Sequence, residues 1–140
     1  VLFYINFSIE LLMSILGAFN NILSDFIDDC ILVFPEDRDF KVYKKGVDLL
    51  VKVNPKKVLT VFTEYTTIYK ENILVKDEVF FLDNNYTDLV SSNSKYSESD
   101  VFNIINKIKG YWVELNDNNK TKIWDYMILL INISDKYYSA

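Results

Sequence analysis

The chain has 140 residues, half of them apolar and 16% aromatic, with a net charge of −5 and an isoelectric point near 4.7. This length and composition correspond to one domain that can bury a core. The acidic balance argues against general nucleic-acid binding, and the lack of histidine excludes Ser-His-Asp or Cys-His catalysis and the usual zinc sites.

The scarcity of turn residues indicates the fold class. Three glycines and two prolines are too few for an all-β protein, which needs many turns. We therefore predict an all-α, single-domain helical bundle of about five helices over residues 1–140. The one cysteine, Cys30, lies on an apolar stripe and is expected to be a small buried hydrophobe. The sequence predicts no catalytic residue, no cofactor and no metal site.

The first 19 residues are apolar and carry one charge, at Glu10. Their polarity pattern continues with helical period to Ile31, which predicts an amphipathic helix over residues 9–31 packed on the other helices. Membrane association through residues 1–19 is the alternative. Because the chain begins with Val1 and Met13 reads like a natural start, we expect residues 1–12 to be an upstream extension.

The next elements are delimited by proline and by capping residues. Phe34-Pro35 ends the first helix, Asp39 is a plausible cap, and a second helix is expected over residues 40–53, with Gly46 marking close packing against a neighbour. Asn54 and Pro55 suit the cap and first position of a third helix, over residues 55–73. Residues 79–82 are too short for a helix of their own and are expected to fold back onto the core.

The second half of the chain begins with a polar stretch. Residues 83–99 are expected to form a surface loop, followed by a helix that begins near Ser97–Asp100 and buries a stripe from Val101 to Leu115. Asp117 or Asn118 should cap a last helix that is apolar nearly all round and therefore central. We expect these two helices to form an antiparallel hairpin, and residues 135–140 to fray.

Charged and aromatic residues supply the candidate sites. Residues 25–39 are acidic and residues 41–57 are basic, so the two segments are expected to attract one another, with an exposed basic patch as the alternative. Asp77 and Glu78 are expected to cap a helix or to lie solvated at the surface. The run from Asp83 resembles the start of a calcium loop but lacks the required Gly and Glu. The possible basic patch comprises Lys41, Lys44, Lys45, Lys52, Lys56 and Lys57, and the possible partner-binding aromatics that fall off the stripes are Tyr111, Tyr126, Tyr137 and Tyr138.

The spacing of several short motifs resembles that of small uncharacterised helical proteins of nucleocytoplasmic large DNA viruses of algae and protists. The motifs are Phe34-Pro35-Glu36-Asp37, Asn54-Pro55-Lys56-Lys57-Val58-Leu59, Asp77-Glu78-Val79-Phe80-Phe81-Leu82, Tyr111-Trp112 and Ile123-Trp124-Asp125-Tyr126. The resemblance covers residues 13–136 and transfers no catalytic residue. It implies a viral structural or host-interaction protein.

These observations together favour a non-enzymatic, intracellular interaction protein, in the host cytoplasm or the virion if the chain is viral. Its partner would be another protein, bound by a helix face or by the tyrosines. A nucleic-acid-associated module that uses the basic patch, and a membrane-associated protein that uses the apolar N-terminus, are the alternatives.

Overall fold

The computed structural model describes residues 2–83 and 100–140, and the regular secondary structure of this part is helical. The elements are α1 (Leu2–Val33), α2 (Asp39–Val53), α3 (Pro55–Thr67), α4 (Lys70–Leu74), α5 (Glu78–Asp83), α8 (Asp100–Tyr111), the 3₁₀ helix η1 (Trp112–Glu114) and α9 (Asp117–Ser139). Five of the seven described α-helices have seven residues or more, which confirms the predicted all-α bundle of about five helices.

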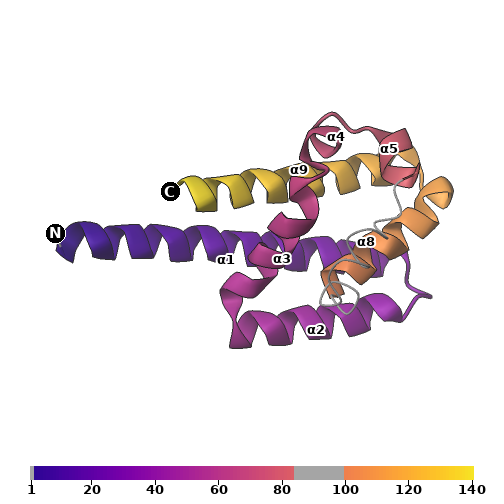
Figure 1. Cartoon of the computed structure of the whole chain (residues 1–140). Helices are drawn as coiled ribbons and strands as arrows, with labels where there is room; N and C mark the ends of the chain where they lie inside the picture. The colour runs from indigo at the N-terminus through magenta and orange to yellow at the C-terminus, as the bar shows by residue number, and fades with distance from the viewer. Residues whose placement is uncertain (1, 84–99) are drawn as a thin grey trace.

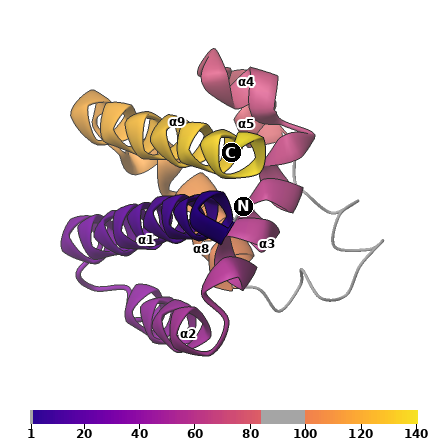
Figure 2. The same ribbon diagram turned by 90° about the vertical axis from the view of Figure 1, so that its left-hand side faces the viewer.

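The helices pack around α1 (Figures 1 and 2). Helix α9 runs antiparallel beside α1, while α2 and α3 cover other sides of α1, and α8 crosses obliquely against α2 and α3. The two ends of the chain therefore lie on the same side of the bundle, and the first part of α1 extends beyond the other helices. Helix α1 is thus both a core element and a projecting one.

Aromatic side chains fill the centre. Phe19 of α1 meets Phe62 of α3 edge to face, with ring centroids 5.3 Å apart. A second cluster joins η1, α9 and α5 near the end of α8. The ring centroid of Trp112 lies 5.4 Å from that of Trp124 and 5.3 Å from that of Phe81. Edge-to-face pairs add stability beyond the area that they bury. The expected return of residues 79–82 to the core is confirmed by the burial of Phe81.

Two features place α2: the close approach of a neighbour to Gly46 and a hydrogen bond of the Asp37 carboxylate. A side chain at Gly46 would bring its Cβ within 2.0 Å of a carboxylate oxygen of Asp100, so the expected close packing at this glycine is confirmed and its neighbour is the start of α8. Arg38, not Asp39, stands at the cap position of α2, and the Asp37 carboxylate accepts the backbone N–H of Asp39 at 3.0 Å. The predicted cap was therefore wrong.

The predicted helix over residues 55–73 is two helices. Helix α3 begins with Pro55, as predicted, but the side chain of Asn54 makes no capping hydrogen bond. Helix α3 ends at Thr67 and α4 begins at Lys70. Thr63, Thr66 and Thr67 donate their hydroxyls to carbonyls four residues back, at 2.6–2.9 Å. Such bonds compete with the backbone ladder and bend helices, which accounts for a break that apolar spacing does not reveal.

A tight turn joins α4 to α5. Lys76 adopts the left-handed conformation, with φ of 56°, and the backbone N–H of Asp77 donates to the carbonyl of Asn72 at 2.9 Å. This is the Schellman arrangement that terminates helices. The Asp77 carboxylate then accepts the N–H of Phe80 at 3.1 Å, which confirms its expected capping role. Because this cap supplies a helix start, residues 78–83 form α5, and the expectation that they were too short for a helix was wrong.

The last two long helices differ from the predicted hairpin. All six residues of the expected inner stripe from Val101 to Leu115 are buried, but α8 packs against α2 and α3 instead of lying along α9. Asn116 caps α9 by accepting the N–H of Asn119 at 2.8 Å, one residue before the predicted positions. Helix α9 is buried on one face only, with Leu129 exposed, because α1 takes the central place.

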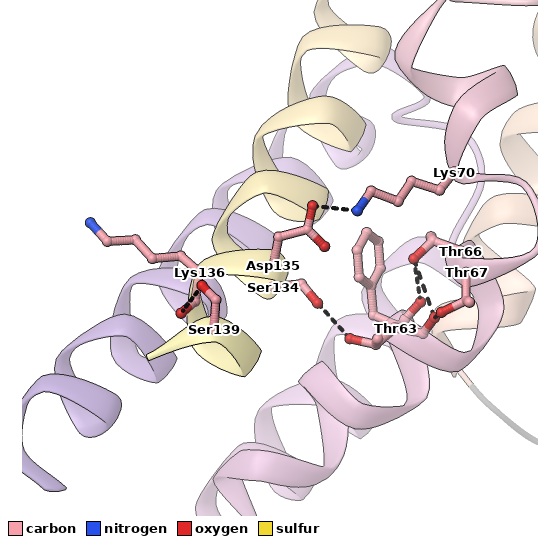
Figure 3. A network of polar contacts seen from close by, with 9 residues as sticks. Thr63, Thr66, Thr67, Lys70, Ser134, Asp135, Lys136 and Ser139 are labelled. Atoms are coloured by element: carbon pink, nitrogen blue, oxygen red, sulfur yellow. Dashed lines mark hydrogen bonds and ion pairs between the residues drawn. The ribbon is translucent and has the colours of Figure 1, made fainter. Parts of the chain in front are cut away.

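The end of α9 is also more regular than expected. The helix continues to Ser139, so the predicted fraying of residues 135–140 was wrong. Ser134 and Thr63 share a hydrogen bond of 2.5 Å, and Lys70 pairs with Asp135 at 2.5 Å, as Figure 3 shows. These contacts tie α9 to α3 and α4. The predicted loop over residues 83–99, the Ser97 cap and the calcium-loop comparison lie outside the described residues apart from Asp83, the last residue of α5.

Candidate interaction surface

The most unusual surface is the first third of α1, residues 2–13, which we call the N-terminal arm. Seven of its large apolar side chains face solvent: among them, Leu2 is 76% exposed, Phe7 59% and Met13 68%. Among the residues of α1 whose side chains the structure describes, Ile15 is the first that is buried. Figure 1 shows the arm projecting past the ends of the other helices. The other exposed apolar residues of the arm are Tyr4, Ile5, Ile9 and Leu11.

The arm has no cover because its neighbouring helices begin and end further along α1. The Asn20 side chain donates to the carbonyl of Pro55, the first residue of α3, at 3.1 Å. At 1.5 Å per residue, Asn20 lies about 10 Å beyond Met13 along the helix axis. The bundle therefore closes around α1 only after the arm has ended.

The arm is apolar on more than one face. Successive residues of a helix are rotated by about 100°, so Phe7 and Ile9 point to nearly opposite sides. Asn6, Glu10 and Ser14 form a narrow polar line between the apolar faces. A surface helix of a globular protein has a wide polar side instead. The arm therefore does not match an element that packs on one partner face.

By length and composition, one helix of the described residues is able to cross a membrane, over Tyr4–Val33, and 22% of its most apolar segment is buried. Core helices and signal sequences have the same length and composition, so this property alone decides little. The division of α1 is more informative: residues from Ile15 onward supply side chains to the core, whereas the described side chains of the arm supply none. The expected helix over residues 9–31 missed this division because periodicity does not show where neighbouring helices end.

Two of the four candidate tyrosines are partly buried and bonded within the fold. The Tyr111 hydroxyl donates to Asp37 at 2.6 Å, and its ring stacks on Phe34 with centroids 4.3 Å apart. This hydrogen bond lowers the pKa of Asp37, and Lys107 adds to the effect. The Tyr126 hydroxyl donates to Asp29 at 2.5 Å, which together with burial raises the pKa of Tyr126 to about 12.

The other two candidate tyrosines lie at the end of α9, near the arm. Tyr137 and Tyr138 meet edge to face with ring centroids 5.3 Å apart, and the ammonium of Lys56 lies 5.8 Å from the Tyr137 ring centre. Tyr138 is half exposed, at 52%. The structure therefore does not gather the four tyrosines into one patch. Tyr111 and Tyr126 lie at the C-terminal end of α1, and Tyr137 and Tyr138 lie at the end of the bundle from which the arm projects.

The predicted attraction between the acidic and basic segments is confirmed at one pair, Lys44 with Asp28. A pairing that the sequence did not reveal involves α8, because Lys107 reaches Asp37 at 3.0 Å and Asp39 at 2.8 Å. The remaining residues of the basic patch, Lys41, Lys45, Lys52, Lys56 and Lys57, are exposed and are spread over α2 and the start of α3.

The described residues offer little for chemistry. They contain no group of three or more His, Cys, Asp or Glu side chains that could hold a metal ion. A pocket beside Cys30 has a volume of about 30 Å³ and is lined mainly by apolar side chains. Burial raises the pKa of the Cys30 thiol to about 12, which keeps it protonated and unreactive and confirms its expected burial. An open groove of about 390 Å³ beside Lys107 and Tyr111 faces solvent.

No protein-family model matches the chain, and no curated protein or solved structure is significantly similar to it. The resemblance to viral proteins therefore stays a hypothesis. Function has to be inferred from the geometry of this chain alone.

Proposed function

We propose that this chain is a non-enzymatic, membrane-associated helical protein whose N-terminal arm inserts into a lipid bilayer. The observation that carries the proposal is the exposure of seven large apolar side chains on several faces of residues 2–13. A bilayer surrounds an inserted helix, so it covers all of these faces at once. A protein groove covers one face and leaves the others in water.

The energetics favour insertion of the arm. Full burial of a large apolar side chain is worth about 1.5–3 kcal/mol, so seven of them contribute on the order of 10 kcal/mol. The backbone N–H and C=O groups of the arm are already paired within the helix, as a bilayer requires. The polar line costs part of this gain. Glu10 lies about 12 Å from Leu2 along the axis, which places its carboxylate near the edge of a leaflet when Leu2 is at the bilayer centre.

The core of the bundle limits how far the helix can enter. The arm is about 18 Å long, compared with about 15 Å for the hydrocarbon of one leaflet. Deeper insertion would remove Ile15 and then Phe19 from the core, and Phe19 is fully buried against Phe62. Insertion into one leaflet therefore uses the apolar arm and keeps the fold, whereas a full span would unfold it.

Vesicle flotation tests the proposal directly. The arm variant carries Ile5→Asn, Phe7→Asn and Ile9→Asn, and the matched control carries Val42→Asn, Val75→Asn and Val113→Asn, which replace residues that are at least as exposed and lie away from the arm. With neutral phosphatidylcholine vesicles, we expect the wild type and the control to float and the arm variant to stay in the dense fraction. Circular dichroism should show that all three chains are helical.

The same proteins also test the competing function, which is binding of the arm to a protein partner. If the arm binds a second copy of the chain or another protein, the wild type will not float with vesicles and will elute as an oligomer in size-exclusion chromatography. Loss of that oligomer in the arm variant would then overturn the membrane proposal in favour of a protein partner. Equal flotation of the wild type and the arm variant would show that the arm is not the contact.

A further inference from the structure

The end of the bundle nearest the arm is surrounded by lysines. Lys52 lies in the last turn of α2, Lys56 and Lys57 in the first turn of α3, and Lys136 in the last turn of α9. All four side chains are exposed. We call these four residues the basic collar.

Two contacts place the collar at the base of the arm. The hydrogen bond from Asn20 to the Pro55 carbonyl fixes the start of α3, with Lys56 and Lys57, against α1 just after the arm. The contact of Lys56 with the Tyr137 ring brings the end of α9 to the same level. Figures 1 and 2 agree, since the turn between α2 and α3 and the C-terminus both lie at the end from which the arm projects.

The charges of the collar are not neutralised within the described part of the chain. Ion pairs are formed there by Lys44, Lys70, Lys76, Lys107 and Lys120, among others, and none of these belongs to the collar. The nearest acid of α9, Asp135, is taken by Lys70, and Figure 3 shows Lys136 pointing away from that pair. Lys56 faces an aromatic ring, which leaves its charge uncompensated.

Acids also gather at the opposite end of the bundle, but several of them have cationic partners there. Asp28 pairs with Lys44, and Asp37 and Asp39 pair with Lys107. What distinguishes the arm end is a group of four lysines that form no ion pair within the described residues. A net charge of −5 repels an anionic surface overall. Attraction to such a surface therefore has to come from this local group of lysines.

We propose that the basic collar binds the head groups of anionic phospholipids when the arm is inserted. This inference rests on the proposed function and deepens it, because it names the class of lipid and the orientation of the bundle. Head groups extend about 5–7 Å beyond the hydrocarbon, and the collar lies about 10 Å beyond Met13, within reach of extended lysine side chains. Tyr137 and Tyr138 lie at the same level, where tyrosine favours the membrane interface.

The collar predicts a selective gain in binding. A lysine near an anionic membrane strengthens binding about fivefold, equivalent to about 1 kcal/mol, so four together give on the order of a hundredfold or more at low salt. We expect the wild type to partition onto vesicles of phosphatidylcholine with phosphatidylserine far better than onto phosphatidylcholine alone. High salt should remove the difference, because salt screens exposed charges.

The test compares two variants that lose the same number of charges. The collar variant carries Lys52→Gln, Lys56→Gln, Lys57→Gln and Lys136→Gln. The control carries Lys41→Gln, Lys45→Gln, Lys76→Gln and Lys122→Gln, at positions that lie away from the arm. We expect the collar variant to lose the preference for phosphatidylserine while it still binds neutral vesicles. The control should keep most of that preference, although both variants become equally more acidic.

The outcomes separate this inference from the proposed function. Equal losses in the two variants, or no loss in the collar variant, would overturn the collar and leave the arm in place. Failure of the wild type to bind neutral vesicles would overturn the proposed function. Binding to anionic vesicles alone, abolished in the collar variant and kept in the arm variant, would mean that the collar anchors the protein and that the arm does not insert.

Discussion

Tyr111 and Tyr126 show what a tyrosine outside an apolar stripe can do within a fold. Both were candidates for partner contacts, and both instead place the hydroxyl on a carboxylate and the ring on a phenylalanine. Helical periodicity identifies these residues as neither core nor surface, because it carries no information about the acids that α1 presents across the bundle. The burial of Cys30 was predicted correctly, because its position on the apolar stripe of α1 is enough to place it in the core.

The hydrogen bond of Tyr126 has a consequence for stability at alkaline pH. Its pKa is about 12 in the folded chain, above the usual value of 10. A raised pKa contributes stability that is present below pH 10 and lost as the pH rises through 12. Tyr126→Phe should lower the free energy of unfolding by about 1–2 kcal/mol at neutral pH. Urea unfolding should show the difference from wild type shrinking between pH 10 and 12.

Tyr138→Phe provides the control for this measurement. Its ring is half exposed at the end of α9, so its hydroxyl is accessible to water. This substitution should leave the free energy of unfolding at neutral pH nearly unchanged. A constant difference for Tyr126→Phe from pH 7 to 12 would contradict the role of the hydroxyl bond and point to ring packing on Phe26 instead.

At the level of helices, the local pattern predicted which faces are buried, and tertiary context decided which helices pair. The stripe of α8 was predicted residue by residue because the 3.6-residue period is a property of the segment itself. The pairing of α8 with α2 was not predicted, since it depends on Gly46 admitting Asp100 from a distant part of the chain. The break after Thr67 depends on hydroxyl bonds that compete with the helix.

The junction between α4 and α5 offers a stabilising substitution. Lys76 has a positive φ, which costs a residue with a Cβ about 1 kcal/mol relative to glycine. Its ion pair with Asp125 is 3.9 Å long and exposed, so it contributes little. Lys76→Gly should therefore raise the free energy of unfolding by about 0.5–1 kcal/mol in urea titrations.

Lys76→Ala provides the contrast, because it removes the same charge and keeps the Cβ. It should be neutral or slightly destabilising. If both substitutions change stability equally, the effect comes from the ion pair and the left-handed backbone is not a source of strain.

On the scale of the whole molecule, α1 divides into a part that folds with the bundle and a part that does not. Removal of residues 1–12 should therefore leave a cooperatively unfolding protein, because Ile15 is the first of the described side chains of the helix to be buried. Calorimetry should show a single transition within a few degrees of the full chain. The shortened chain should also be more soluble, since an exposed apolar surface promotes association.

Loss of cooperative unfolding in the shortened chain would contradict this division and assign residues 1–12 to the core. The expectation that these residues form an upstream extension bears on the proposed function, because a native protein that begins near Met13 would lack the arm. Intact-mass measurement of the native protein tests both: a mass that includes Val1 would refute the expectation and leave the proposed function open to the vesicle test.

The continuity of α1 determines how an inserted protein would stand. The same uninterrupted helix forms the arm and the centre of the bundle, so the bundle is mounted on a stiff rod and does not swing on a tether. From Met13 to Val33, this rod is about 30 Å long at 1.5 Å per residue. An arm held upright in one leaflet would hold the turn between α1 and α2, with its ion-paired acids, at that height above the hydrocarbon and facing away from the bilayer.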